Sequence, residues 1–215
     1  MAQIFPKWTN HFPTVAAVAG LMVTFLVVAF VWYFFSPWYT DVGYRPVQPL
    51  PYNHKLHAGD LGMDCRYCHN YVEMSPHANV PPTQTCMNCH TLILTESETL
   101  LPVRESWNTK EPIAWTRVHK VADYAYFDHS AHLYAGIGCY DCHGNVADMI
   151  VVLQKQPLSM GWCLECHRNP DSHLRPHEDL TNMSWAPLEN QKAFAERIKS
   201  EKKLVPPEDC SGCHR

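Results

Sequence analysis

The stretch that decides the fold is "FDHSAHLYAGIGCYDCH", residues 127–143, which places three histidines and two cysteines close together. It ends in Cys-x-x-Cys-His, with a histidine directly after the second cysteine. Most of the pattern occurs earlier, as "YNHKLHAGDLGMDCRYCH" at residues 52–69. The chain has ten cysteines, and all of them fall in five copies of the same pentapeptide, so that none is left over.

Cys-x-x-Cys-His is the attachment signature of c-type haem. Two thiols at this spacing reach the two vinyl groups of one porphyrin, and the histidine then lies where its imidazole can bind the iron. Zinc ribbons also use Cys-x-x-Cys but do not require the following histidine. A disulfide framework does not fit, because every cysteine belongs to one of these motifs and none is left over to form a disulfide. The sequence therefore predicts five covalently bound c-type haems, held by Cys65, Cys68, Cys86, Cys89, Cys139, Cys142, Cys163, Cys166, Cys210 and Cys213, with iron ligands His69, His90, His143, His167 and His214.

Five haems in a chain of 215 residues leave too little protein for an ordinary apolar core. We therefore expect a mostly irregular and α-helical multihaem cytochrome c, with short helices at the attachment motifs and little or no β structure. The net charge of −4 shows no basic excess, which argues against nucleic-acid binding.

Residues 15–35 carry no charged side chain. At about 1.5 Å per residue, a helix of that length spans the roughly 30 Å hydrocarbon core of a bilayer. A cleavable signal peptide is the alternative, but its apolar region is shorter, about 7–15 residues. We expect a cytoplasmic N-terminus (1–13), a transmembrane helix (14–35), a proline-rich linker (36–51) and a pentahaem domain (52–215). Because c-type haem is attached outside the cytoplasm, the expected localisation is the inner membrane, single-pass, with the haem domain on the periplasmic face.

Each iron needs a second axial ligand beyond its motif histidine. His54 and His57 precede Cys65 as His129 and His132 precede Cys139, and a further motif follows each time. Residues 52–90 and 127–167 thus look like two copies of a two-haem module, with a fifth haem at 210–214. Histidines three apart share a helix face yet diverge enough to serve two irons. The pairing resembles c3/c7-type cytochromes, in which the first histidine caps the nearest downstream haem and the second a neighbour. The alternative is that all four are surface histidines.

Other candidate ligands are His119 and Met183. A methionine more often only packs. His11 precedes the predicted anchor, on the wrong side of the membrane. The remaining histidines lie among prolines and charges and are expected to be exposed to solvent: His77, His173 and His177.

Three strings, "WTRVHKVADYAYFDHSAHLYAGIGCYDCHG", "PLSMGWCLECHRNP" and "LRPHEDLTNMSW", resemble the membrane-anchored pentahaem cytochrome c subunit of alternative complex III. The resemblance extends over nearly the whole chain. It implies a subunit of a quinol:electron-acceptor oxidoreductase. It also implies three partners: a polytopic quinol-binding membrane subunit, an iron–sulfur subunit similar to molybdopterin oxidoreductases, and a monohaem cytochrome c. It favours Met183 as an axial ligand.

The leading hypothesis is an electron-relay subunit with no catalytic site of its own, within a respiratory or photosynthetic membrane complex. Six candidate distal ligands for five irons (His54, His57, His119, His129, His132 and Met183) leave no iron obviously open to substrate, although one candidate must then be surplus. The alternative is a self-sufficient, membrane-anchored quinol dehydrogenase. An enzyme that reduces nitrite or a similar substrate would need an open iron and is disfavoured.

The apolar pattern over residues 188–204 predicts an amphipathic helix, with one face formed by Leu188, Phe194, Ile198 and Leu204. Pro206 and Pro207 then end it. Because the fifth motif lies at the end of the sequence, we expect its haem at an edge of the domain, facing a partner. The alternative is that the tail folds back and buries it.

Overall fold

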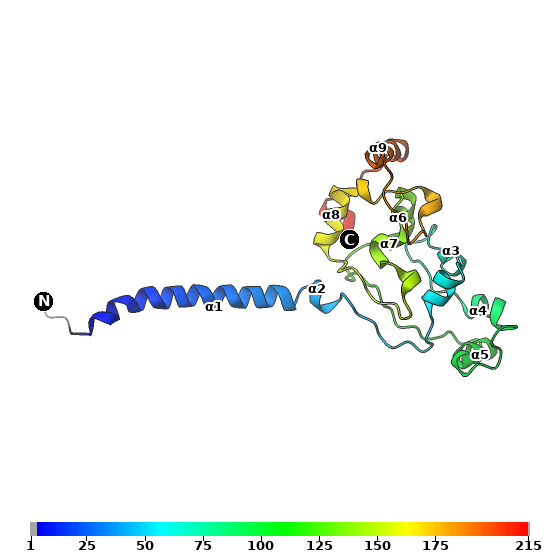
Figure 1. Cartoon of the computed structure of the whole chain (residues 1–215), viewed down its shortest axis with the longest axis horizontal. Coiled ribbons are helices and arrows are strands. Elements are labelled where there is room, and N and C mark those ends of the chain that lie inside the picture. The colour runs from blue at the N-terminus through cyan, green and yellow to red at the C-terminus, as the bar shows by residue number, and fades with distance from the viewer. Residues whose placement is uncertain (1–3, 215) are drawn as a thin grey trace. The chain divides into compact units, whose positions relative to one another are not determined.

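The computed structural model describes residues 4–214, and the chain divides into two compact units, Met1–Asp41 and Val42–Arg215. The first unit holds a 3₁₀ turn η1 (Lys7–His11), the long helix α1 (Phe12–Phe34) and the short helix α2 (Pro37–Thr40), drawn in blue in Figure 1. Within residues 4–214, η1 and α1 together form the single helical stretch long and apolar enough to cross a membrane, with a mean hydropathy of 2.5. The predicted long apolar N-terminal helix is therefore confirmed.

The second unit consists of short helices joined by loops (Figure 1). In the part of the chain that the structure describes there is no strand, only isolated bridges that join Ala125 to His214 and Ile137 to Leu174. The predicted mixture of helix and irregular structure is confirmed. Its helices are η2 (Lys55–Asp60), α3 (Cys65–Cys68), α4 (Thr83–His90), η3 (Glu98–Leu100), α5 (Leu101–Thr109), α6 (His129–Ala135), α7 (Cys139–His143), η4 (Val146–Asp148), α8 (Met160–Arg168), η5 (Pro170–Ser172), η6 (His177–Asp179), α9 (Gln191–Lys202) and α10 (Cys210–Cys213).

Short polar side chains begin several of the helices that carry cysteines or histidines. Asp64 accepts a hydrogen bond from the Arg66 amide at the start of α3, and Asp209 accepts one from the Gly212 amide in α10. Asp128 accepts bonds from the first amides of α6 in the same way. Such caps satisfy donors that a helix leaves unpaired at its N-terminus, each stabilising the helix by about 1 kcal/mol.

The apolar core of this unit is divided into three small clusters. One joins Ile137 and Leu174 to α9, a second lies around Val103 of α5, and a third joins Val72, Leu133 and Leu180. The third cluster brings together two regions that are far apart in the sequence. Val72 follows the first attachment motif, and Leu133 precedes the third. Leu180 is 1% exposed and belongs to the same cluster as both, so the segment after η6 packs where the two repeated regions meet.

The predicted helix over 188–204 is observed as α9, three residues later at its start and two residues earlier at its end. Its residues Phe194 and Ala195 are buried, and Ile198 packs beside them against Ile137 and Leu174. Leu188 lies outside the helix and is 41% exposed, because the chain before Gln191 forms a turn instead. The apolar stripe of α9 therefore packs on the chain's own second repeat.

Candidate haem-binding sites

All five Cys-x-x-Cys-His pentapeptides lie on or at the end of a helical turn: α3, α4, α7, α8 and α10. In α3 the His69 amide donates to the Cys65 carbonyl at 2.8 Å, and in α10 the His214 amide donates to the Cys210 carbonyl at the same distance. One turn of helix brings side chains four apart onto the same face. Each motif thus presents its first thiol and its histidine together. No disulfide joins any of the ten cysteines, all of which lie in the described residues.

Four of the motif histidines are held in the orientation that suits metal binding. Their Nδ1 atoms bond backbone carbonyls: His69 to Asn79 at 2.6 Å, His90 to Ile93 at 3.0 Å, His167 to Pro207 at 2.7 Å and His214 to Tyr124 at 3.1 Å. A carbonyl can only accept, so Nδ1 carries the proton and Nε2 keeps its lone pair. Metal-ligating histidines are fixed by a second bond of this kind, so these residues fit an iron ligand at Nε2.

The first His-x-x-His segment builds a compact group of rings. Tyr52 packs edge-on against His54, with ring centroids 4.7 Å apart, and stacks on His57 at 4.6 Å. The His57 Nδ1 donates to the Asn53 carbonyl at 2.9 Å, which again leaves Nε2 free. The centroid of the His57 ring lies 6.3 Å from that of His90, the histidine of the second motif.

The second His-x-x-His segment repeats this geometry almost unchanged. Phe127 packs edge-on against His129 at 4.8 Å and stacks on His132 at 4.6 Å. The His132 Nδ1 donates to the Asp128 carbonyl at 2.7 Å, and its ring faces that of His167 in the fourth motif at 6.1 Å. Sequence reasoning overlooked the two aromatic residues, although aligning the repeats by their histidines would have put Tyr52 opposite Phe127.

The repeats differ by one residue between the histidines and the cysteines. His54 lies eleven positions before Cys65, whereas His129 lies ten before Cys139. The extra residue is taken up in η2, a π-helix in which the Leu61 amide donates to the Leu56 carbonyl at 3.0 Å. One wide turn absorbs an inserted residue without shifting the residues after it.

The ring distances match two imidazoles on opposite sides of one metal. A metal–nitrogen bond of about 2 Å puts each ring centroid about 3 Å from the metal, so two trans ligands have centroids about 6 Å apart. His57 with His90 and His132 with His167 meet this condition, and so does His129 with His143 at 6.3 Å.

His119 and His143 are only 4.3 Å apart, too close to enclose an iron. His119 bonds the Leu153 backbone, and its buried Nε2 has no hydrogen-bond partner. The buried Nδ1 of His54 is likewise unpartnered.

Burial keeps these imidazoles neutral, the form that binds metal. Desolvation lowers the pKa of His54 to about 4, that of His119 to about 4 and that of His143 to about 3. The pKa values of His129 and His132 are also lowered, chiefly by burial. All five are therefore uncharged at neutral pH.

The other sequence candidates lie apart from these rings. His77 and His177 are exposed, as expected, and the His177 Nε2 lies 3.2 Å from Glu73. The His173 side chain is 40% exposed and donates to Asp141 at 2.7 Å, so this histidine is partly solvated and also holds a fixed partner. Met183 is half-buried in the segment after η6, near Leu180 and Thr181 in sequence.

Direct contacts join the attachment motifs in pairs. The side-chain amide of Asn88, in the second motif, donates to the hydroxyl of Tyr67, in the first motif, at 3.1 Å. The thiols of Cys65 and Cys139, the first cysteines of the first and third motifs, lie close enough to affect each other's pKa. The segment after η6 spans the same junction, because the Cys139 amide donates to the Leu180 carbonyl and Thr181 donates to Asp64.

The later motifs are joined in the same way. The His132 ring of the second repeat faces His167, which links the surroundings of the third and fourth motifs. The fourth motif reaches the C-terminal segment through the bond from His167 to the Pro207 carbonyl and an ion pair between Arg168 and Glu208 at 3.3 Å.

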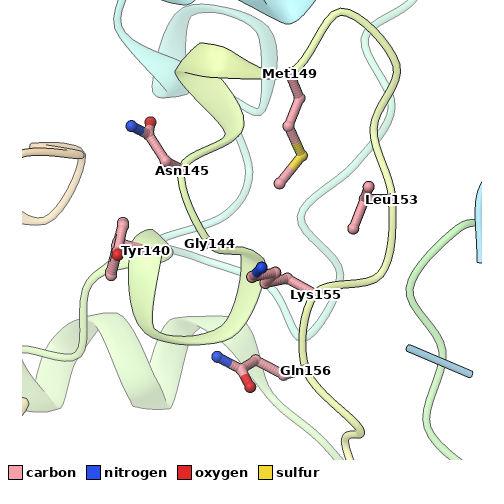
Figure 2. A pocket seen from close by; sticks show the side chains of 7 residues that line it. All are labelled: Tyr140, Gly144, Asn145, Met149, Leu153, Lys155 and Gln156. Carbon is pink, nitrogen blue, oxygen red and sulfur yellow. The ribbon is translucent and has the colours of Figure 1, made fainter. Parts of the chain in front are cut away.

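A hollow of about 340 Å³ opens beside the third motif (Figure 2). The Lys155 side chain lies against Gly144, where a Cβ atom would come within 2.8 Å of it, so the position after His143 must stay small. The lining combines apolar and polar side chains: Tyr140, Gly144, Asn145, Met149, Leu153, Lys155 and Gln156.

Helical Cys-x-x-Cys-His turns, neutral buried imidazoles and ring pairs spaced to enclose a metal define a multihaem cytochrome c. No family model matches the sequence. The chain is 30% identical over 160 residues to the multiheme cytochrome c subunit of menaquinone reductase from Nitratidesulfovibrio vulgaris, a match that covers 65% of this chain and 74% of the relative. The chain belongs to this family of multihaem cytochrome c subunits.

Proposed function

We propose that this chain is the electron-relay subunit of a quinone-linked membrane oxidoreductase and carries five c-type haems. The observation that supports this best is the pair of matching ring groups, in which the His57 ring lies 6.3 Å from that of His90 and the His132 ring 6.1 Å from that of His167. Two histidines on one iron leave no position for substrate and favour simple electron transfer. A c-type haem supplies a one-electron iron centre; the polypeptide holds it, fixes its ligands and limits its contact with water.

Ring distances support three pairs of axial ligands, and the repeat adds a fourth. His57 pairs with His90, His132 with His167 and His129 with His143, each at the spacing that two ligands of one iron need. By analogy with His129 and His143, His54 would pair with His69. Each first histidine then serves its nearest downstream motif, and each second histidine serves the next. His119 and Met183 remain as candidates for the iron held by His214.

The contacts between motifs give the relay an order that differs from the order in the sequence. The second motif contacts the first, the first contacts the third, and the third leads through the fourth to the fifth. The two repeats would thus meet head to head at Cys65 and Cys139. In this proposal electrons enter or leave at the second and fifth motifs, and the fifth faces a partner subunit.

The whole assembly is a further part of the proposal. The resemblance of the sequence to alternative complex III favours quinol oxidation, with electrons passed to a periplasmic acceptor. The partners would be a polytopic quinol-binding subunit, an iron–sulfur subunit and a monohaem cytochrome c. The relative from N. vulgaris is part of a menaquinone reductase, which supports the link to quinone and favours the reverse direction of flow. In both cases α1 would anchor the chain with its N-terminus inside.

Intact-mass spectrometry tests the haem count, for which we expect five haem additions and no disulfide. Quinol addition tests the relay. The intact membrane complex should reduce its haems with a quinol analogue, whereas the isolated chain should not. Reduction by the isolated chain would instead support the alternative, a self-sufficient membrane-anchored quinol dehydrogenase. Fewer than five additions would remove at least one motif from the relay.

A further inference from the structure

A buried ion pair lies directly against the third attachment motif. Asp141, between the two cysteines of that motif, binds the guanidinium of Arg175 through its Oδ2. The side chains are only 14% and 2% exposed. His173 donates to the other carboxylate oxygen at 2.7 Å. The carboxylate therefore has both a fixed cation and a second donor, each brought to it by a segment more than thirty residues further along the chain.

The fold holds the Arg175 side chain in place from several sides. Its guanidinium carbon lies 4.3 Å from the centre of the Trp185 ring, a cation–π contact. The Arg175 amide donates to the Gly136 carbonyl at 2.9 Å. A Cβ atom on Gly138 would come within 2.4 Å of the guanidinium, so the arginine lies on bare backbone immediately before Cys139.

The charges of this pair lie in a part of the fold with little solvent. The buried Nε of Arg175 has no partner, although arginine keeps its charge in all ordinary conditions. Charges in a poorly solvated region act strongly on their neighbours, because little water screens them. The Asp141–Arg175 pair therefore projects a field onto the attachment motifs beside it.

That field acts on the third motif, because both charges lie against it. Asp141 is itself a residue of the motif, directly before Cys142. The Arg175 guanidinium lies against Gly138, directly before Cys139.

We propose that Asp141 and Arg175 set the reduction potential at the third motif by opposing electrostatic effects. The inference rests on the proposed relay of haems. Reduction adds one electron to the iron, so a nearby carboxylate disfavours the reduced state and a nearby guanidinium favours it. Both are positioning residues that act through the field at the iron and do not touch it.

The test compares Asp141→Asn with Arg175→Gln in the haem-loaded full chain. Potentiometric titration followed by haem absorption measures the midpoint potentials, and electron paramagnetic resonance monitors the low-spin irons. We expect Asp141→Asn to shift one midpoint upward and Arg175→Gln to shift the same midpoint downward, with haem content unchanged. Arg175→Lys keeps the charge and should lie between Arg175→Gln and the native chain.

A purely structural role predicts a different outcome, because loosening the site by either change would shift the potentials in the same direction. Shifts of equal sign, or no shift in either variant, would overturn the proposal. If Arg175→Gln loses haem, Asp141→Asn decides alone, since only an upward shift supports the field. The control is Arg168→Gln, whose ion pair with Glu208 is 58% and 51% exposed and should change the midpoints less. If mass spectrometry shows that the native chain lacks its third or fourth haem, the proposed relay is refuted. The proposal about the Asp141–Arg175 pair is not refuted by that result.

Discussion

Replacing His57 and His132 by alanine, singly and together, tests the proposed axial ligands most directly. Their rings face two different motif histidines, His90 at 6.3 Å and His167 at 6.1 Å, so each would serve a different iron. With the five irons proposed for the chain, each single variant should convert about one fifth of the low-spin iron to a high-spin or water-bound form. The double variant should convert about two fifths, because changes at separate irons add.

The assay is spin quantitation by electron paramagnetic resonance on the oxidised, haem-loaded chain, with intact mass confirming that all haems remain attached. His177→Ala is the matched control. This histidine is exposed, and its ring pairs with the surface carboxylate of Glu73. It should leave the low-spin signal unchanged. Full low-spin signal in both single variants would return His57 and His132 to the surface-histidine alternative. A double variant that equals either single one would mean that both act on one iron.

Three further predictions concern stability and potential. Gly136→Ala should destabilise the chain by more than the roughly 1–2 kcal/mol of a left-handed residue, because φ is +102° and a Cβ would lie 2.9 Å from a backbone oxygen. Gly62→Ala, at φ +66° in open space, should cost only that amount, and denaturant midpoints compare the two. The Arg66 hydrogen bond lowers the pKa of Asp64 to about 2, so Asp64 stabilises the fold above about pH 4 and loses this as pH falls toward 2. The carboxylate is 42% exposed, so Asp64→Asn should flatten that acid dependence by less than about 1 kcal/mol, as measured by denaturation across this pH range. Met183→His should lower one midpoint potential in a redox titration if the thioether binds iron, and an unchanged set of midpoints would remove Met183 from the ligands.

The attachment motifs and the helix-and-loop fold could be predicted because covalent chemistry fixes the spacing of cysteines and histidine within one turn. The repeat was also visible, since both copies keep His-x-x-His ahead of the cysteines. The Asp141–Arg175 pair could not be found this way. The two residues are 34 positions apart, and no periodicity relates an arginine in a loop to a residue between two cysteines.

The surplus of candidate ligands is a case that spacing along the sequence cannot decide and that ring distances in the structure can. Six side chains were chemically suitable for five irons, and spacing along the chain treats them alike. Ring separation divides them: about 6 Å for His57, His129 and His132 from a motif histidine, but 4.3 Å for His119. An iron does not fit in the shorter gap, so His119 cannot share an iron with His143 as the two now lie. Its buried, unpartnered Nε2 still calls for a ligand or donor, because a polar atom without a partner costs about 1–3 kcal/mol in a buried position. His119 and Met183 therefore stay as the predicted candidates for the iron of the fifth motif, and the titration of Met183→His distinguishes them.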